Sequence, residues 1–323
     1  MHCLGVLMAA AAMACAPSGA GAGDAYPTRP VTIVVPYPAG GIVDVRVREV
    51  AADLEKRLAQ QVLVENRPGA MGLLGADRVA KSKPDGYTIL AGSISDLAIA
   101  PALGVRIPFD IDKDLAPITQ FVQGEAILVV PASVGVESVA DLLRLIRQKP
   151  GELNYPTAGQ GTLLHFLGRV FVKAAGAEAV DVPYKGGSMY MPDLVSGRLQ
   201  FAFDFVPTSL PFIEGGRLRA LLTTGARRIP ILPQVPTARE AGLPELEIAT
   251  WAGFFAPAGT PRPAIDRLNA AFAEVLSQPA LRARWQAQGA EPRPSSPEDF
   301  LAHWRAERVR WKRVADATGI KLE

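Results

Sequence analysis

Short apolar runs alternate with amphipathic stretches along the first two thirds of the chain. Apolar runs predict buried strands, and apolar positions three or four residues apart predict helices between them. This alternation is typical of α/β domains with largely parallel sheets. The predicted strands are Val31–Val35, Gln61–Val64, Tyr87–Leu90, Ala126–Val130, Leu153–Tyr155, Ala179–Val182, Leu199–Phe203 and Leu218–Thr223. The predicted helices are Asp44–Leu58, Leu73–Ala80, Pro192–Ser196 and Thr208–Glu214, with two more that begin at Ser138 (Ser-x-x-Asp, a capping pattern) and at Leu163.

The last hundred residues are mostly helical. A strand over Ala249–Ala256 precedes three predicted helices, Pro261–Leu276, Ala280–Gln288 and Pro297–Thr318. Ser296 is the expected N-cap of the last one, because a proline and two acids follow it. On that helix one face carries Phe300, Trp304, Trp311 and Val314, and the other carries Arg305, Arg308, Arg310, Lys312 and Arg313. This pattern predicts tryptophans in the core and a solvated basic face, not a nucleic-acid site.

The chain is long enough for two domains. Its 323 residues exceed the length that one hydrophobic core normally supports. They are 49% hydrophobic, which excludes a disordered chain. The 34 Lys and Arg against 32 Asp and Glu give a net charge of +2, so charge offers no case for binding nucleic acid or an acidic membrane. Because no long linker is evident, we expect short crossings between the domains, with 120–131 and 218–224 as candidates.

The N-terminus has the pattern of a secretory signal peptide over residues 1–25. An apolar run from Leu4 to Ala16 is too short to span a membrane and is followed by small residues, although no Lys or Arg precedes it. Both cysteines, Cys3 and Cys15, lie in this leader, and Cys15 as a lipidated N-terminus is the alternative. A mature chain from Tyr26 therefore has no cysteine, which excludes disulfides, thiol catalysis and thiolate metal sites. We expect an exported protein.

Glycine-containing turns follow four of the predicted strands, and each leads into a helix. They are Val35–Gly41, Leu90–Ser95, Tyr155–Thr162 and Val182–Gly187. Ligands of parallel α/β sheets sit at the carboxyl ends of the strands, and helix N-termini there attract anions. Ordinary strand–helix geometry is the better explanation of any single turn, but the four turns together favour a cleft that closes on a small anion.

Other chemistry is poorly supported. No turn carries a nucleotide-binding or phosphate-loop pattern, and Gly-x-Ser-x-Gly is absent. Two histidines and no cysteine in the mature chain argue against metal catalysis. His165 is either a helix-start histidine bonded to nearby backbone or a donor that faces the cleft. Asp204, at the end of a strand, would hold either loop amides or a cationic group of a ligand.

The motifs resemble those of the Bug-type periplasmic solute-binding proteins of tripartite tricarboxylate transporters. The resemblance covers essentially the whole mature chain. It rests on Tyr26–Pro30, Val34–Gly41 with Asp44, Val64–Ala70, Lys83–Tyr87, Leu153–Tyr155, Ala158–Thr162 with His165, Val182–Gly186, Leu218–Leu221, Leu232–Thr237, Glu240–Pro244 and Ala256–Pro261.

This resemblance implies a type II periplasmic-binding-protein fold, in which two α/β lobes surround a central ligand cleft. We expect lobe 1 to comprise 26–124 plus 225–323 and lobe 2 to comprise 125–224. It also implies that a carboxylate is held mainly by backbone amides and hydroxyls, without cofactor or metal. The implied ligand-binding residues are Tyr37, Pro38, Ala39, Gly40, Gly41, Asp44, Ser93, Ser95, Asp96, Gly159, Gln160, Gly161, Thr162, His165, Lys185, Gly186, Gly187 and Asp204.

The implied function is capture of a small organic carboxylate in the periplasm by a monomer, which delivers it to a membrane permease. Partnership with a membrane receptor kinase is the alternative for the same fold, and a periplasmic hydrolase is a third hypothesis. The chain departs from the family pattern at Ile42, Val43, Leu163 and the run Met189–Met191, where small residues or hydroxyls are usual. Lost donors and added apolar bulk predict a ligand less polar than citrate, such as an aromatic or longer aliphatic carboxylate.

Overall fold

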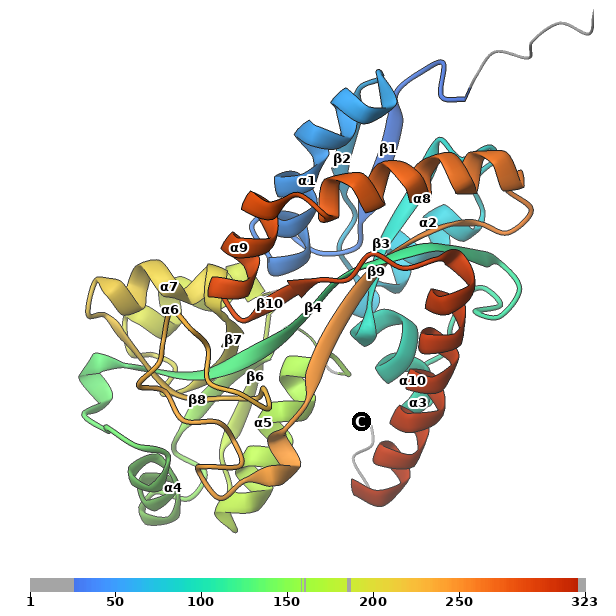
Figure 1. Cartoon of the computed structure of the whole chain (residues 1–323). Coiled ribbons are helices and arrows are strands. Elements are labelled where there is room, and N and C mark those ends of the chain that lie inside the picture. The colour runs from blue at the N-terminus through green and yellow to red at the C-terminus, as the bar shows by residue number, and fades with distance from the viewer. Residues whose placement is uncertain (1–25, 158, 160, 185–186, 319–323) are drawn as a thin grey trace, which may run out of the picture.

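A parallel βαβ arrangement opens the chain in this computed structural model, which describes residues 26–157, 159, 161–184 and 187–318 (Figure 1). β1 (Val31–Val35) pairs in parallel with β2 (Val62–Asn66) and with β3 (Thr88–Ser93). α1 (Ile42–Leu58) connects the first two strands, and α2 (Leu73–Ala80) connects β2 to β3. β1 is buried along nearly its whole length, as its continuous apolar run predicts. The predicted signal peptide lies outside the described residues.

The strand β4 (Leu115–Pro131) extends through both lobes, as Figure 1 shows. Its first half pairs with β9 (Ala249–Pro257) and with β10 (Ala290–Pro292). Its second half pairs with β7 (Ala202–Phe205) and β8 (Leu218–Thr223). β8 therefore stays in the second lobe, and the chain returns to the first lobe through β9. The division at 124/125 and 224/225 stays a prediction.

The sheets are mixed, so the expectation of largely parallel pairing was wrong. β3 with β9, and β4 with β7, β8, β9 and β10, are all antiparallel. The strand order in the first lobe is β10-β4-β9-β3-β1-β2. The pattern of alternating strands and helices describes β1 to β3 correctly, but it carries no information about strands that return across a domain boundary.

The second lobe is built on the far half of β4. β5 (Asn154–Thr157) and β6 (Val180–Pro183) form a separate parallel pair. α4 (Val139–Gln148) begins at the predicted cap, where Ser138 Oγ accepts the Asp141 N–H at 3.1 Å. The other helices are α5 (Leu163–Ala175), α6 (Gly187–Val195) and α7 (Val206–Glu214). Each lies where the hydrophobic pattern predicts one, although α6 and α7 begin earlier than expected.

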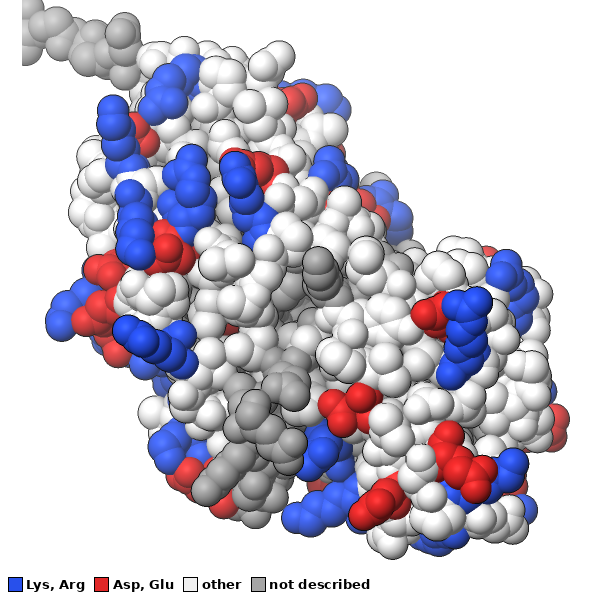
Figure 2. All heavy atoms as spheres, turned by 180° about the vertical axis from the view of Figure 1, so that it is seen from behind, with Lys and Arg blue, Asp and Glu red and all other residues white. Residues whose placement is uncertain are grey.

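The C-terminal region returns to the first lobe as α8 (Arg262–Leu276), α9 (Pro279–Ala287) and α10 (Pro297–Thr318). Trp304 and Trp311 on α10 are buried, as predicted. The basic side chains of α10 are exposed apart from the half-buried Arg308. Figure 2 shows the molecule from behind relative to Figure 1, and positive and negative side chains are interspersed over that surface. The solvated-face interpretation is confirmed.

Short helical turns complete the structure. A π-helix over Ser95–Ile99 runs directly into α3 (Ala100–Ala102). 3₁₀ turns occupy Ala70–Gly72, Ala132–Val134 and Pro244–Leu246. None of these short elements was predicted from the sequence. The π-helix matters most for the site because it follows β3 at the lobe boundary.

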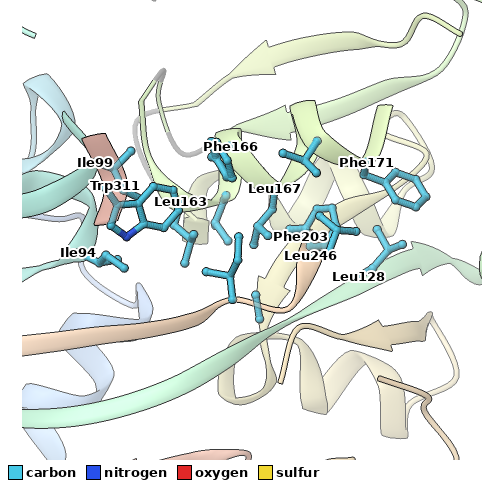
Figure 3. Packing of buried hydrophobic residues seen from close by; sticks show 14 of the residues in the cluster. Ile94, Ile99, Leu128, Leu163, Phe166, Leu167, Phe171, Phe203, Leu246 and Trp311 are labelled. Atoms are coloured by element: carbon cyan, nitrogen blue, oxygen red, sulfur yellow. The ribbon is translucent and has the colours of Figure 1, made fainter. Parts of the chain in front are cut away.

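One cluster of buried side chains continues from the first lobe into the second. Ile94, Ile99 and Trp311 belong to the first lobe, and Leu163 and Phe166 belong to α5 of the second. The rings of Phe166 and Trp311 meet edge-on with centroids 5.0 Å apart. Figure 3 shows these five side chains packed together. The lobes are therefore joined by apolar packing as well as by the shared strand.

Trp304 links α10 to the π-helix. Its indole Nε1 donates to the Leu97 carbonyl at 2.9 Å, and its ring packs edge-on against Phe255 at 4.9 Å. We expect Trp304→Phe to lower the free energy of unfolding by about 1–3 kcal/mol, because the change keeps a ring but removes the hydrogen bond. Trp304→Ala should cost about 3–5 kcal/mol because it also leaves a cavity.

Urea unfolding of the two variants measures both effects. The exposed neighbour Arg305 supplies the control, since Arg305→Ala should change the free energy of unfolding by less than about 0.5 kcal/mol. Equal stability of the wild type and Trp304→Phe would contradict a structural role for the indole N–H.

Candidate ligand-binding cleft

A cavity of about 110 Å³ lies where the two lobes meet. Its walls come from the turn after β1, the start of α1, β4 and β9, the first turns of α5 and α7, and the turn between α9 and β10. This volume exceeds several-fold the space that one water molecule needs. Seven residues expected from the resemblance line it: Tyr37, Pro38, Gly41, Ser93, Ser95, Thr162 and Asp204.

The remaining predicted site residues are placed differently. Described residues that are not part of the wall are Ala39, Gly40, Asp44, Asp96, Gly159, Gly161 and His165. Gly187 is the first residue of α6. Gln160, Lys185 and Gly186 lie outside the described residues. Contact of any of these residues with a ligand stays a prediction.

Tyr37, Ser93 and Asp96 form a hydrogen-bonded group at the end of β3. The Tyr37 hydroxyl donates to Asp96 Oδ1 at 2.6 Å and lies 2.7 Å from Ser93 Oγ. The Ser93 N–H donates to the same carboxylate oxygen at 2.8 Å. Burial raises the pKa of Asp96 to about 6, although these hydrogen bonds oppose the shift. Asp96 therefore fixes the wall residues Tyr37 and Ser93 in place.

Asp44 holds the turn between β1 and α1. Its carboxylate accepts the Gly40 N–H at 2.8 Å, Arg48 Nε at 2.9 Å and Asn66 Nδ2 at 2.9 Å. Burial alone would raise the pKa of Asp44, but the hydrogen bonds from Arg48, Gly40 and Asn66 and the Arg48 charge hold it below its usual value. All of these partners are protein groups, so the carboxylate positions the loop that lines the cavity.

The N-terminus of α5 opens onto the cleft. Thr162 is the N-cap, and its side chain accepts the His165 N–H. The first helical N–H, that of Leu163, donates across the lobes to Ser95 Oγ at 3.2 Å. The N–H groups at this end have no intrahelical acceptor and lie at the positive end of the helix dipole, which suits a carboxylate.

His165 is a helix-start histidine bonded to backbone. Its Nδ1 accepts the Gly161 N–H at 3.1 Å, and its side chain is buried. Burial lowers the pKa of His165, with a smaller opposing effect from Asp181, so the ring is neutral. The geometry agrees with the first of the two interpretations of this residue.

Asp204 lies in the wall and accepts hydrogen bonds mainly from hydroxyl groups. Its Oδ2 accepts from Thr208 at 2.8 Å and from Ser209 at 2.5 Å, and Tyr190 lies 3.1 Å from Oδ1. Burial raises the pKa of Asp204 despite these hydrogen bonds. The Phe205 backbone also lowers the pKa of Asp204 by hydrogen bonding, so one backbone amide contributes beside the hydroxyls. Contact of Asp204 with a ligand stays a prediction.

Two charged wall residues were missed by the sequence analysis. Glu125 precedes the predicted strand Ala126–Val130, and Arg46 lies on the apolar face of α1. Glu125 could have been noticed as a charged residue inside an expected crossing, and Arg46 as a charged residue on an apolar helix face. Burial raises the pKa of Glu125 to about 7, and Thr223 Oγ1, 3.4 Å away, opposes this only weakly.

The apolar departures from the family pattern are only partly in the cavity. Ile42, Val43 and Leu163 line it. Met189 is 54% exposed and takes no part in the wall. Tyr190 and Met191 are buried in the core of the second lobe. The expected loss of polarity therefore rests on the first three residues alone.

The described residues contain no group of histidine, cysteine or acidic side chains that could hold a metal ion. Across the same part of the chain, no helix has both the length and the apolar character to cross a bilayer.

Glu125 gives the fold a pH dependence of definite sign. Its folded pKa of about 7 lies above the unfolded value of about 4.3, so its ionisation disfavours the folded state. The free energy of unfolding should fall as the pH rises from about 4.5 through 7, and Glu125→Gln should flatten this part of the curve. Urea unfolding of both proteins across that range measures the difference, and parallel curves would contradict it.

Comparison with known proteins identifies relatives over nearly the whole chain. The family model described as "Tripartite tricarboxylate transporter family receptor" (TctC) matches residues 46–320. The protein BugT of Bordetella pertussis is 35% identical over 321 residues, covering 99% of this chain and 97% of BugT.

Two solved structures share the fold closely. Rpa4515 of R. palustris, solved with adipate, has a TM-score of 0.88 and 37% identity, covering 92% of this chain and 99% of its own. MatC of Rhodopseudomonas palustris, with bound malate, has a TM-score of 0.84 and 32% identity over 90% of this chain and 99% of its own. The expected two-lobe, type II periplasmic-binding-protein fold is confirmed. The chain thus belongs to the TctC family of tripartite tricarboxylate transporter receptors, which are periplasmic solute-binding proteins and not enzymes.

Proposed function

We propose that this protein captures a small organic carboxylate in the cleft between its lobes and delivers it to a membrane permease of the tripartite tricarboxylate type. The observation that carries the first part is the N-terminus of α5 at the cavity wall, next to the hydroxyls of Ser93, Ser95 and Thr162. Two similar proteins were solved with adipate and malate, both of which are carboxylates.

The site takes groups from both lobes, so it is complete only while the lobes are in contact. Ser95 comes from the first lobe and the Leu163 N–H from the second, and they are already in contact at 3.2 Å. A carboxylate that accepts from the Ser95 hydroxyl, and that shares or displaces its hydrogen bond from the Leu163 N–H, binds the closed arrangement better than the open one. Ligand binding therefore shifts the population toward closure, which is the state that a permease would recognise.

The ligand class follows from the lining. Ile42, Val43 and Leu163 present apolar side chains to the cavity, and a tricarboxylate such as citrate would leave polar groups unpaired against them. We therefore expect a ligand less polar than citrate.

The first test is thermal unfolding of the mature protein against mono-, di- and tricarboxylates, aromatic acids included. A ligand at 100 times its dissociation constant should stabilise the fold by about 2.7 kcal/mol. Aliphatic or aromatic acids should give larger shifts than citrate. Tighter binding of citrate would overturn the expected ligand class, and no shift with any carboxylate would overturn carboxylate binding itself.

The double variant Ile42→Ser, Val43→Thr tests whether the apolar wall selects the ligand. Introducing two hydroxyls should raise the affinity for citrate relative to adipate by roughly thirtyfold, because each new hydrogen bond contributes about 1 kcal/mol. An unchanged ratio would show that these side chains do not select the ligand.

Delivery to a permease is tested by co-purification. The tagged, ligand-loaded protein should retain a multi-spanning permease subunit from detergent-solubilised membranes of its own organism, identified by mass spectrometry. Resin that carries no protein is the control. Capture of a receptor kinase in place of the permease would overturn delivery in favour of a sensing role.

A further inference from the structure

We propose that Arg46 forms a second anion-binding subsite in the same cleft, so that the ligand carries a second acidic group joined to the first by an apolar spacer. This inference rests on the proposed carboxylate function and extends it to a specific chemical class, the unbranched dicarboxylates.

Arg46 occupies a position that the helix pattern reserves for an apolar side chain. The neighbouring positions of the buried face of α1 carry Val43, Val47, Val50 and Leu54. Arg46 is only 1% exposed to solvent, and yet it lines the cavity. A buried charge on an apolar face violates the local rule for a stable helix, and such violations concentrate at functional sites.

The guanidinium is only partly satisfied. Nη1 donates to Glu49 Oε2 at 3.0 Å, whereas Nε and Nη2 are buried and have no hydrogen-bond partner among the described residues. The N–H bonds of Nε and Nη2 point along one edge of the planar group. That edge is the fork that receives both oxygens of a carboxylate.

Neighbouring side chains restrict the orientation of the Arg46 guanidinium. Its guanidinium carbon lies 4.7 Å from the ring centroid of Trp285, and Trp285 Nε1 donates to Glu49 Oε2 at 2.6 Å. Arg284 Nε lies 3.6 Å from the other Glu49 oxygen. Glu49 is thus shared among three donors, which leaves the charge of Arg46 incompletely balanced for an incoming anion.

The rest of the wall suits a spacer between two acidic groups. Ile42 and Val43 are apolar and lie within one helical turn of Arg46, while the N-terminus of α5 with Ser95 offers the first carboxylate position. One ligand can use both positions only if its acidic groups are separated by a chain of defined length. A monocarboxylate of equal length would leave the Arg46 fork unpaired.

The test is isothermal titration of the mature protein with straight-chain dicarboxylic acids of four to eight carbons and with the monocarboxylic acids of equal length. In the wild type, one diacid should bind roughly tenfold to hundredfold more tightly than its monoacid, the usual range for a charge-assisted hydrogen-bonded pair. Affinity should peak at one diacid length, whereas the monoacids should show no such peak.

Arg46→Leu should abolish the preference for the diacid and leave monoacid affinity unchanged or higher. Arg284→Leu is the matched control, because it removes a positive charge beside the same Glu49 from a side chain that is 48% exposed and outside the cavity wall. It should keep the wild-type preference. Should Arg46→Leu fail to fold, Arg46→Gln serves in its place, and the length dependence in the wild type needs no variant.

The outcomes separate this inference from the proposed function. Equal affinity for diacids and monoacids in the wild type, or an intact preference in Arg46→Leu, would overturn the Arg46 subsite while carboxylate binding stands. Absence of binding by both series would overturn carboxylate binding and the subsite together. Loss of the preference in Arg284→Leu as well would show a general charge effect and also overturn the subsite.

Discussion

The shared strand β4 is the constraint on which the rest of the structure depends. Glu125 pairs with Ala249 of the first-lobe sheet, and its neighbour Ala126 pairs with Phe205 of the second. The lobes thus meet within one hydrogen-bonded strand and not in a loop. Gly124 and Glu125 at this point are cavity residues, so the cleft lies at the place where the chain changes sheet. A Cβ on Gly225 would come within 2.0 Å of the Glu125 carboxyl carbon, and the absence of that atom makes room for the acid.

Buried carboxylates position the residues of the cleft by accepting hydrogen bonds from them. Asp44 secures the turn before α1, and Asp96 secures Tyr37 and Ser93. Asp204 is surrounded by hydroxyl donors from its own lobe. Each carboxylate accepts hydrogen bonds from protein groups, although Asp96 Oδ2 has no hydrogen-bond partner among the described residues. These hydrogen bonds partly offset the negative charge that the proposed anionic ligand would meet. The positive contributions to the cleft are then the α5 dipole and the partly satisfied guanidinium of Arg46.

Much of the fold could be predicted because apolar periodicity reports burial directly. Val31–Val35, Leu73–Ala80, Leu218–Thr223 and Pro297–Thr318 are elements with the predicted limits. The first half of β4 escaped detection because polar residues such as Gln120 and Gln123 interrupt its apolar run. Its pairing partner β9 lies more than a hundred residues later, and local patterning contains nothing about such a contact.

The site was predictable in outline but not in detail. The family resemblance located the loops whose residues line the cavity, including Tyr37, Ser95 and Thr162. It could not indicate that Asp96 would point into a local network or that His165 would bond to Gly161. Those roles depend on side-chain directions that only the packed structure determines. Arg46 and Glu125 depart from the local hydrophobic pattern, and that pattern alone does not reveal which cavity a charge will face.

The distribution of tryptophan gives the molecule a built-in optical reporter. All four tryptophans lie in the last quarter of the sequence, on β9, α9 and α10 of the first lobe. Trp251 lines the cavity, Trp285 stacks on Arg46, and Trp311 meets Phe166 of the second lobe. Under the proposed function, occupation of the cleft would change the polarity around the first two, and separation of the lobes would expose the third. Intrinsic fluorescence would then report ligand entry and lobe movement without any attached dye.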